Sequence, residues 1–332
     1  MKKFFFFAAA AAIAMTACTK TQTTAVSEGN LIRFSNSFVD NVTKTDVTTT
    51  SIAKFWVYGE SADGTGTVFS NMPVTKNADA WTNGELVYWT PSQDHFFAAY
   101  ADGESNIADA SLVFSRENSS LTFTQYAVGT NDLVAAVTTK NPGDLTTTPD
   151  AVQLTFKHML SKVKFTFKTG AAHDQVMEVA DLTVNAVNKA DGTLTLADAE
   201  QNVTWNTTGT VASGDYVYSP ITDFANEDGT ASSEEKYFIP QSNESLTVTF
   251  TVTWKISEAE GAETKTADFT GTLAYPDGEN SWKPGLSYNY VAEIDPEDVD
   301  PSLENRVIKF EVVKVEEWVD QNVDYTPDNQ GE

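Results

Sequence analysis

Apolar and polar residues alternate along most of this chain, and this period of two is the feature that most restricts its fold. Residues 246–252 read LTVTFTV and residues 163–167 read VKFTF. Alternation places one set of side chains on the core face of a strand and the other set toward solvent. Valine, threonine, phenylalanine and tyrosine, which favour strands, dominate these runs. Each run therefore predicts a half-buried β-strand.

Turn signals separate the predicted strands. Asn-Gly and Asp-Gly pairs, which supply the positive φ of tight hairpins, recur between the runs. Residues 81–89 (WTNGELVYW) are interpreted as one hairpin around Asn83-Gly84. Many short antiparallel strands joined by turns predict an all-β chain built of sandwiches or barrels.

The chain has 332 residues, enough for two domains of ordinary size. Residues 140–150 (KNPGDLTTTPD) are polar and contain two prolines, so they mark the expected boundary. We expect an N-terminal β-domain over residues 30–150 and a C-terminal one over residues 151–318. Residues 18–29 would form a polar tether, and residues 319–332 an acidic polar tail.

One run changes phase. In residues 154–167 (LTFKHMLSKVKFTF) the apolar side chains occupy even positions as far as 160 and odd positions from 163. A slip of one residue turns every side chain to the other face, so we expect a bulge or a helical turn at about residues 159–162. His158 shares a face with Phe156 and Leu160, and we interpret it as a core histidine bonded to backbone.

The beginning of the chain has the layout of a secretory signal peptide. Lys2 and Lys3 precede an apolar run at residues 4–15, which is too short for a transmembrane helix of roughly 20 residues. Residues 15–18 (MTAC) resemble the bacterial lipobox, which implies removal of residues 1–17 and acylation of Cys18. Two or more acyl chains hold a protein firmly on a membrane. The alternative is an ordinary signal peptide followed by an idle cysteine.

Charge and motifs exclude several functions. The formal net charge of −26 argues against binding nucleic acid, whose phosphates need lysine and arginine. The sequence has no HExxH, CxxC, P-loop or GxGxxG motif, so we predict neither a catalytic site nor a cofactor. The acidic residues 295–300 lack the spacing of a calcium loop and are interpreted as a solvated linker.

Several segments in order give the chain a family resemblance. They are IRF (32–34), TKTD (43–46), KFWVYG (54–59), WTNGELVYWTPSQDHFFAAYA (81–101), LTFKHMLSKVKFTF (154–167), YFIPQS (237–242), WKPGLSYNYVAEI (282–294) and IKFEVVKVEEW (308–318). Together with the lipobox they are similar to the fimbrillin family, the pilin subunits of Bacteroidales type V pili.

The resemblance implies a fold and an assembly route. The fold would be two tandem transthyretin-like β-sandwich domains with Greek-key type antiparallel strands. The chain would be exported as a lipoprotein to the outer membrane at the cell surface and enter a fimbrium after maturation. In polymerising members a trypsin-like protease cuts after an Arg or Lys in the loop that follows the first strand. A strand of the next fimbrial subunit then fills the groove that this strand leaves.

For the cut we predict Lys44, because its threonine-rich surroundings suit an exposed loop. Arg33 is the second candidate. It ranks below Lys44 because it lies inside a strand pattern. The displaced first strand would contain Leu31, Ile32 and Phe34.

The sequence also indicates a donor strand. LIRF (31–34) and VIKF (307–310) share the order apolar, Ile, basic, Phe, so the second could replace the first in one groove. The candidate donor residues are Val307, Ile308, Phe310 and Val312. Two alternatives stay open. In the first, residues 307–318 are the last strand of the C-terminal domain and are not donated. In the second, the chain is a non-polymerising outer-membrane surface lipoprotein that binds a glycan or host ligand.

Overall fold

A computed structural model describes residues 28–39, 52–64, 67–78, 80–169, 176–222, 229–241, 246–255, 261–273, 275, 280–299 and 307–317. Within these residues the elements are strands and three short 3-10 helices, which are η1 (Glu28–Asn30), η2 (Asp109–Ser111) and η3 (Pro296–Val299). The predicted all-β fold is confirmed. The transthyretin-like topology stays a prediction.

The strands are numbered in chain order. Their bounds are β1 Phe34–Val39, β2 Lys54–Ser61, β3 Thr67–Asn77, β4 Ala80–Asn83, β5 His95–Asp102, β6 Leu112–Ser115, β7 Ser120–Ala127, β8 Leu133–Lys140, β9 Val152–His158, β10 Ser161–Lys168, β11 Val176–Ala197, β12 Glu200–Asn206, β13 Ala212–Val217, β14 Thr230–Ser232, β15 Lys236–Phe238, β16 Leu246–Lys255, β17 Thr264–Leu273, β18 Leu286–Glu293, β19 Val307–Lys309 and β20 Glu311–Glu317.

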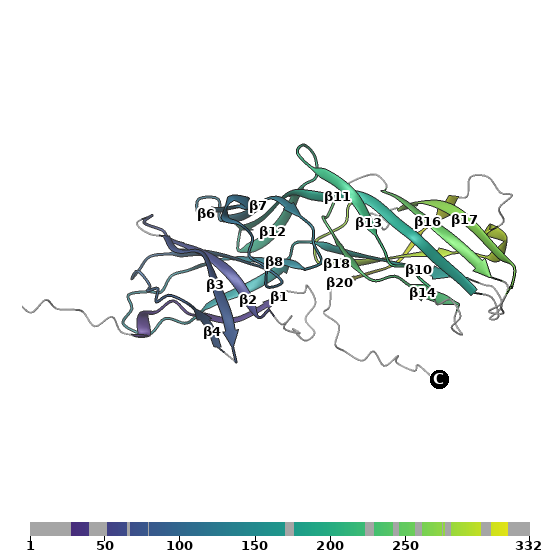
Figure 1. The fold of residues 1–332 in the computed structure, drawn as a ribbon. Coiled ribbons are helices and arrows are strands. Elements are labelled where there is room, and N and C mark those ends of the chain that lie inside the picture. The colour runs from purple at the N-terminus through teal and green to yellow at the C-terminus, as the bar shows by residue number, and fades with distance from the viewer. Residues whose placement is uncertain are drawn as a thin grey trace, which may run out of the picture.

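These strands form three sheets in two units that lie end to end (Figure 1). A seven-stranded sheet has the order β1-β9-β8-β5-β2-β3-β4. A five-stranded sheet has the order β14-β10-β18-β20, with β15 also on β10. An eight-stranded sheet runs β19-β17-β16-β11-β7-β6, with β12 and β13 also on β11. Most pairs are antiparallel as expected, but β1 with β9, β10 with β18 and β17 with β19 are parallel.

Strand β11 belongs to both units. Its residues 176–184 pair with β16 and residues 183–189 with β13, both in the second unit. Residues 189–195 pair with β7 and residues 191–197 with β12, both in the first unit. Ala186 accordingly packs in the core of the second unit, whereas its neighbour Val187 packs in a core of the first. One uninterrupted strand therefore runs through the junction (Figure 1).

The strand pairing does not follow the expected boundary at residues 150 and 151. Strand β9 pairs with β1 and β8 in the first unit. Residues 189–206 return to that unit after β10 and the beginning of β11 have paired in the second. The polar stretch 140–150 is a loop of the first unit, where Gly143 accepts a 2.6 Å hydrogen bond from the backbone N–H of Ser92. The prolines of this loop therefore mark a turn between neighbouring strands.

The phase change at residues 159–162 has a different cause from the expected bulge or helical turn. The chain leaves the first unit after β9 and enters the second at β10. The alternation shifts because Phe156 faces a core of the first unit and Val163 faces the core of the second. Met159 and Leu160, which make the crossing, are completely buried.

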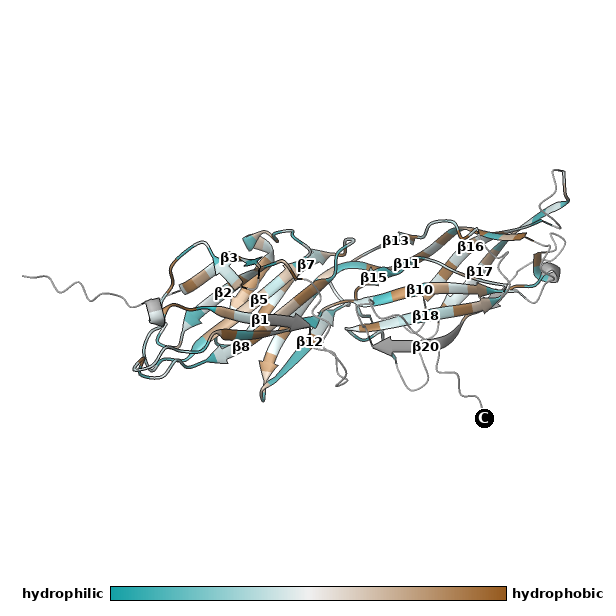
Figure 2. Ribbon diagram, turned by 90° about the horizontal axis from the view of Figure 1, so that it is seen from below, coloured by the Kyte–Doolittle hydropathy of each residue, from teal (hydrophilic) through white to brown (hydrophobic). Residues whose placement is uncertain are grey.

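The seven-stranded sheet is buried on both faces, so the first unit has two cores. In β5, Phe96, Ala98 and Tyr100 face a core shared with β7, β11 and β12. Alternate residues of β5 face the other core, which we call the inner core. β5 is apolar over much of its length (Figure 2). The inner core contains Ile32, Phe34, Ile52, Phe55, Val57, Phe69, Val74, Trp89, Phe97, Ala99, Ala101, Val134, Ala136, Val152, Leu154 and Phe156.

Nearly all inner-core residues come from the seven-stranded sheet itself. A sheet can enclose its own side chains in this way only by curling around them. Ile32 and Trp89 also belong to the inner core but lie outside the named strands. The second unit differs, because its core lies between the five-stranded and eight-stranded sheets.

His158 lies at the junction of the units and is 5% exposed. Its Nδ1 is 2.7 Å from Oδ2 of Asp132, on the loop before β8. The expected burial is confirmed, and the carboxylate of Asp132 is a partner that the sequence did not indicate. His173 lies outside the described residues.

His95 is a titratable side chain buried beside Phe97 and Trp89 of the inner core. Its side chain is fully buried, with Nδ1 3.0 Å from the carbonyl oxygen of Gln93 and Nε2 3.4 Å from the backbone N–H of Thr90. Burial lowers the pKa of His95 below its ordinary value, although the Gln93 carbonyl and nearby carboxylates act in the opposite direction. The His95 imidazole is therefore harder to protonate in the folded chain than in the unfolded chain, where it takes up a proton below about pH 6.5.

From this lowered pKa we expect the free energy of unfolding to fall as the pH drops through and below the unfolded value. The variant His95→Gln, which cannot titrate in this range, should lose less stability between pH 7 and pH 5. Urea unfolding of both proteins at the two pH values measures the difference. Equal losses in the two proteins would mean that His95 does not cause the acid sensitivity.

Candidate strand-exchange site

Residues 28–39, which we call the first segment, close the curled sheet from one side to the other. The backbone N–H of Ile32 donates to Val87 O at 2.8 Å, and the N–H of Trp89 donates to Asn30 O at 3.0 Å. From Phe34 onward the segment pairs in parallel with β9. The first segment thus bridges residues 87–89 and β9, which the rest of the sheet leaves apart.

This pairing corrects the expected hairpin at residues 81–89. Strand β4 ends at Asn83, and Tyr88 forms an antiparallel bridge with Leu31. Residues 87–89 therefore pair with the first segment instead of with residues 81–83. The alternation of this stretch is correct, but its partner is distant in sequence.

Two predicted residues of the first strand anchor the segment. Ile32 is 2% exposed and Phe34 is 5% exposed, and both lie in the inner core. The ring of Phe34 lies 5.6 Å from that of Phe55, 5.6 Å from Phe69 and 6.2 Å from Phe97. Such tilted and edge-to-face contacts add to the burial energy of aromatic rings. Leu31, the third predicted residue, is only half-buried.

The two predicted cleavage positions differ in what surrounds them. Arg33 is exposed, but it lies between buried Ile32 and Phe34, and its carbonyl accepts a 2.7 Å hydrogen bond from Val152 N. A protease needs several extended residues in its active site, so cutting here would require the segment to leave the core first. Lys44 lies outside the described residues, as does Cys18.

The candidate donor strand is placed in the second unit. Strand β19 pairs in parallel with the edge of β17, and β20 pairs antiparallel with β18. Of the predicted donor residues, Val307 and Ile308 lie in β19 and Val312 lies in β20, where the structure describes only the backbone. Phe310, between the two strands, is 5% exposed.

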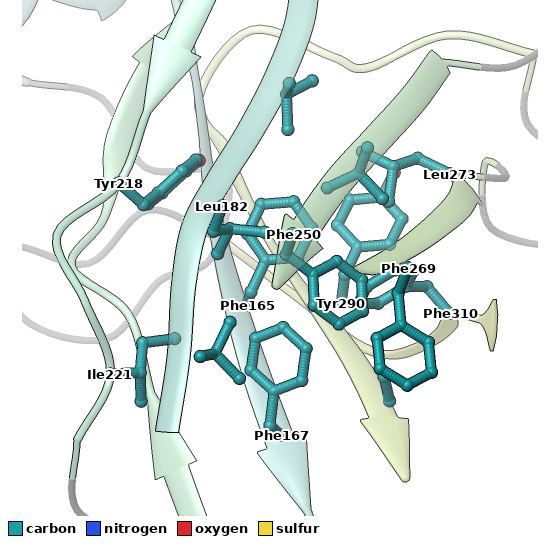
Figure 3. Close-up of a cluster of buried hydrophobic side chains, with 14 of the residues drawn as sticks. Phe165, Phe167, Leu182, Tyr218, Ile221, Phe250, Phe269, Leu273, Tyr290 and Phe310 are labelled. Atoms are coloured by element: carbon teal, nitrogen blue, oxygen red, sulfur yellow. The ribbon is translucent and has the colours of Figure 1, made fainter. Parts of the chain in front are cut away.

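Phe310 occupies an aromatic pocket of its own unit (Figure 3). Its ring lies 5.5 Å from that of Phe165, 6.0 Å from Phe167 and 5.9 Å from Phe250. The pocket resembles the one that holds Phe34, because each of the two residues contacts three other phenylalanine rings. Each also lies in or next to an edge strand that pairs in parallel, β1 for Phe34 and β19 for Phe310. The two similar sequences, LIRF and VIKF, thus occupy similar surroundings in the two units.

Gly271 in β17 makes room for Phe310, a role that is only weakly marked in the sequence. A Cβ atom at Gly271 would lie 2.5 Å from Cε2 of Phe310 and 3.0 Å from Cγ1 of Val248. With any larger residue at this position the Phe310 ring or its neighbours would have to shift. The only local sequence signal is a glycine within a strand, which often marks a close approach of this kind.

Two further features bear on function. Among the described residues, no three His, Cys, Asp or Glu side chains gather as a metal site would require. In the same part of the chain no helix is long and apolar enough to span a bilayer.

Comparisons with known proteins give a family. The model of the fimbrillin-like family matches residues 41–318. No curated protein matches the chain. Similar solved structures include a candidate cell adhesion protein from Bacteroides uniformis, which is 16% identical with a TM-score of 0.46 over 88% of this chain and 99% of that one. A candidate cell adhesion protein from Parabacteroides distasonis is 12% identical with a TM-score of 0.49, over 87% and 97%.

The fimbrial anchor protein Mfa2 from Porphyromonas gingivalis is also similar, at 10% identity and a TM-score of 0.36 over 77% of this chain and 88% of that one. The family assignment itself rests on the match over residues 41–318, which spans most of the chain. The chain belongs to the fimbrillin-like family.

Proposed function

We propose that this chain is a structural subunit of a cell-surface fimbrium and supports adhesion. It is exported as a lipoprotein through Cys18 to the outer membrane, and it assembles after a trypsin-like protease removes the first strand. The observation that carries the proposal is the position of the first segment, which closes the inner core while forming the edge of its sheet. Family membership supports the same role.

Removing the first segment would open a groove with two hydrogen-bonding walls. One wall is residues 87–89, which now bond to Asn30 and Ile32, and the other is β9. The floor would be the inner-core side chains around Phe55, Phe69 and Phe97. Each large apolar side chain that leaves forfeits roughly 1.5–3 kcal/mol of burial. An exposed apolar groove flanked by unpaired backbone strongly favours an added strand.

The C-terminal segment of another copy is the proposed strand. Phe310 would exchange one ring-lined pocket for another, so the burial that it loses in its own unit is regained in the groove. Filling the groove of one copy in this way opens the Phe310 pocket of the other, so the exchange changes the total burial little. Two alternatives remain: residues 307–317 stay in place as the last strand of the second unit, or the chain is a non-polymerising surface lipoprotein.

The cleavage step gives a direct test in cells. We expect Lys44→Gln to block removal of the first strand, because a trypsin-like protease no longer finds a basic residue there, and to abolish fimbriae. Arg33→Gln is the matched control and should mature normally, since Arg33 lies between two buried neighbours. Mass spectrometry of the surface protein measures the mature N-terminus. Normal maturation of Lys44→Gln would exclude Lys44 as the site.

A further inference from the structure

Strands β9 and β10 follow one another across the junction of the two units. β9 ends at His158 and β10 begins at Ser161, so only Met159 and Leu160 lie between them. We call residues 152–168 the spine. A linker between mobile domains is ordinarily exposed and polar, but both linking residues here are apolar and 0% exposed.

Both units hold the backbone of this link. The N–H of Met159 donates to Leu133 O at 2.9 Å, and its carbonyl accepts a 2.6 Å hydrogen bond from Nε1 of Trp205, both groups of the first unit. The carbonyl of Leu160 accepts a 2.8 Å bond from the N–H of Gly285 in the second unit. The link is therefore clamped on each side of the junction.

Beyond the link, β10 is an interior strand of the five-stranded sheet. Lys162 to Lys168 pair in parallel with Ser287 to Glu293 of β18. Strands β14 and β15 pair with its other edge. Val163, Phe165 and Phe167 are all 0% exposed. A pull along β10 is thus resisted by ladders on both edges and by the core beneath it.

From this continuity we infer that the spine is the tension-bearing element of the subunit. A strand bound beside β9 pulls along the axis of β9, and the clamped link transmits this force to β10. The force then reaches β18 as a shear of the hydrogen bonds between β10 and β18. An extended strand rises about 3.3 Å per residue, close to its full length, so within the spine only the link, which bends at Leu160, can lengthen before a strand pair breaks. Strand pairs sheared along their axis must break together, whereas pairs pulled across the axis break one after another.

This inference rests on the proposed function for the origin of the load. The geometry itself concerns a single chain and needs no polymer. β20, which pairs antiparallel with β18, lies next to the strand that receives the load. In a filament, where residues 307–317 would have left this sheet for another subunit, the path from the acceptor edge at β9 would run through the spine and the β10–β18 ladder to the end of β18.

Single-molecule pulling on the full chain tests the inference. The only cysteine is Cys18, so Cys18→Ser permits attachment at two introduced cysteines. Handles at Asp150→Cys and Glu293→Cys, both exposed positions, load the spine lengthwise. Handles at Asp215→Cys and Thr270→Cys, also exposed, load the eight-stranded sheet across its strands. We expect a rupture force about twofold or more higher lengthwise, because those ladders are sheared.

The variant Trp205→Phe tests the clamp, because it keeps a ring but removes the hydrogen bond to Met159. It should lower the lengthwise rupture force and leave the crosswise force unchanged. Equal forces in the two directions would overturn the inference. So would a Trp205→Phe variant that changes both forces equally or neither. A strong spine in a chain that forms no filaments would instead count against the proposed function alone.

Discussion

Replacing Phe34 by alanine is expected to lower the free energy of unfolding of the uncut chain by about 3–5 kcal/mol and to leave the assembled filament unchanged. The loss arises because Phe34 is 5% exposed among three other phenylalanine rings of the inner core. Under the proposed function the filament should not respond, because cleavage after Lys44 would have removed residue 34. Denaturant unfolding of the uncut chain and thermal dissociation of filaments measure the two effects.

Phe97→Ala is the matched control for this prediction. Phe97 is fully buried in the same core, but it lies in β5 and remains in the mature subunit. It should destabilise both the uncut chain and the filament. If Phe34→Ala weakened filaments as much as Phe97→Ala does, the first strand would still be present in them.

Replacing Gly271 by alanine is expected to destabilise the uncut chain by roughly 1–3 kcal/mol, the usual cost of overpacking a core. The new methyl group would lie 2.5 Å from the Phe310 ring, so the ring and the adjoining C-terminal strands must shift. If those strands are donated, a loosened Phe310 leaves its own unit more readily. Filaments should then form faster after cleavage, as light scattering would record.

Gly129→Ala is the control, because a Cβ at Gly129 meets nothing within 4 Å. Its stability should stay the same or rise slightly, and its assembly rate should not change. Slower assembly of Gly271→Ala than of the unmodified chain would indicate that residues 307–317 are the last strand of the second unit and not a donor.

The sequence was sufficient to predict strands because a strand's pattern is local. The alternation at residues 246–252 and 163–167 reports which face of each strand is buried, and β16 and β10 carry that pattern in the structure. The burial of Ile32 and Phe34 agrees with the first strand that the family resemblance implied. These features depend on neighbours two positions apart, which the sequence contains.

The pairing of strands that are distant in the sequence was harder to predict. Residues 81–89 were assigned to a hairpin because a turn signal lies between two alternating runs, yet Tyr88 bridges Leu31. The same limitation affected the boundary, since the polar loop 140–150 joins strands of one unit and the true crossing, at Met159 and Leu160, is apolar and buried. Because both units bury this crossing and bond to its backbone, its residues are apolar and lack the polar composition of a flexible linker.

The pocket around Phe310 also could not be predicted from the sequence. The shared order of LIRF and VIKF indicated a relation between the two segments, but nothing local indicated which residues surround Phe310. Phe165, Phe250 and Gly271 come from three different strands, and only the folded chain brings them together.

Limited trypsin treatment of the purified chain tests the central claim most directly. We predict that filaments appear by electron microscopy only after cleavage and that their subunits begin at Thr45. An excess of a synthetic peptide with the sequence of residues 28–39 should suppress assembly by refilling the groove, whereas a scrambled peptide should not. Filaments composed of chains that still begin at Cys18, or assembly that the peptide leaves unaffected, would contradict removal of the first strand as the step that opens the subunit.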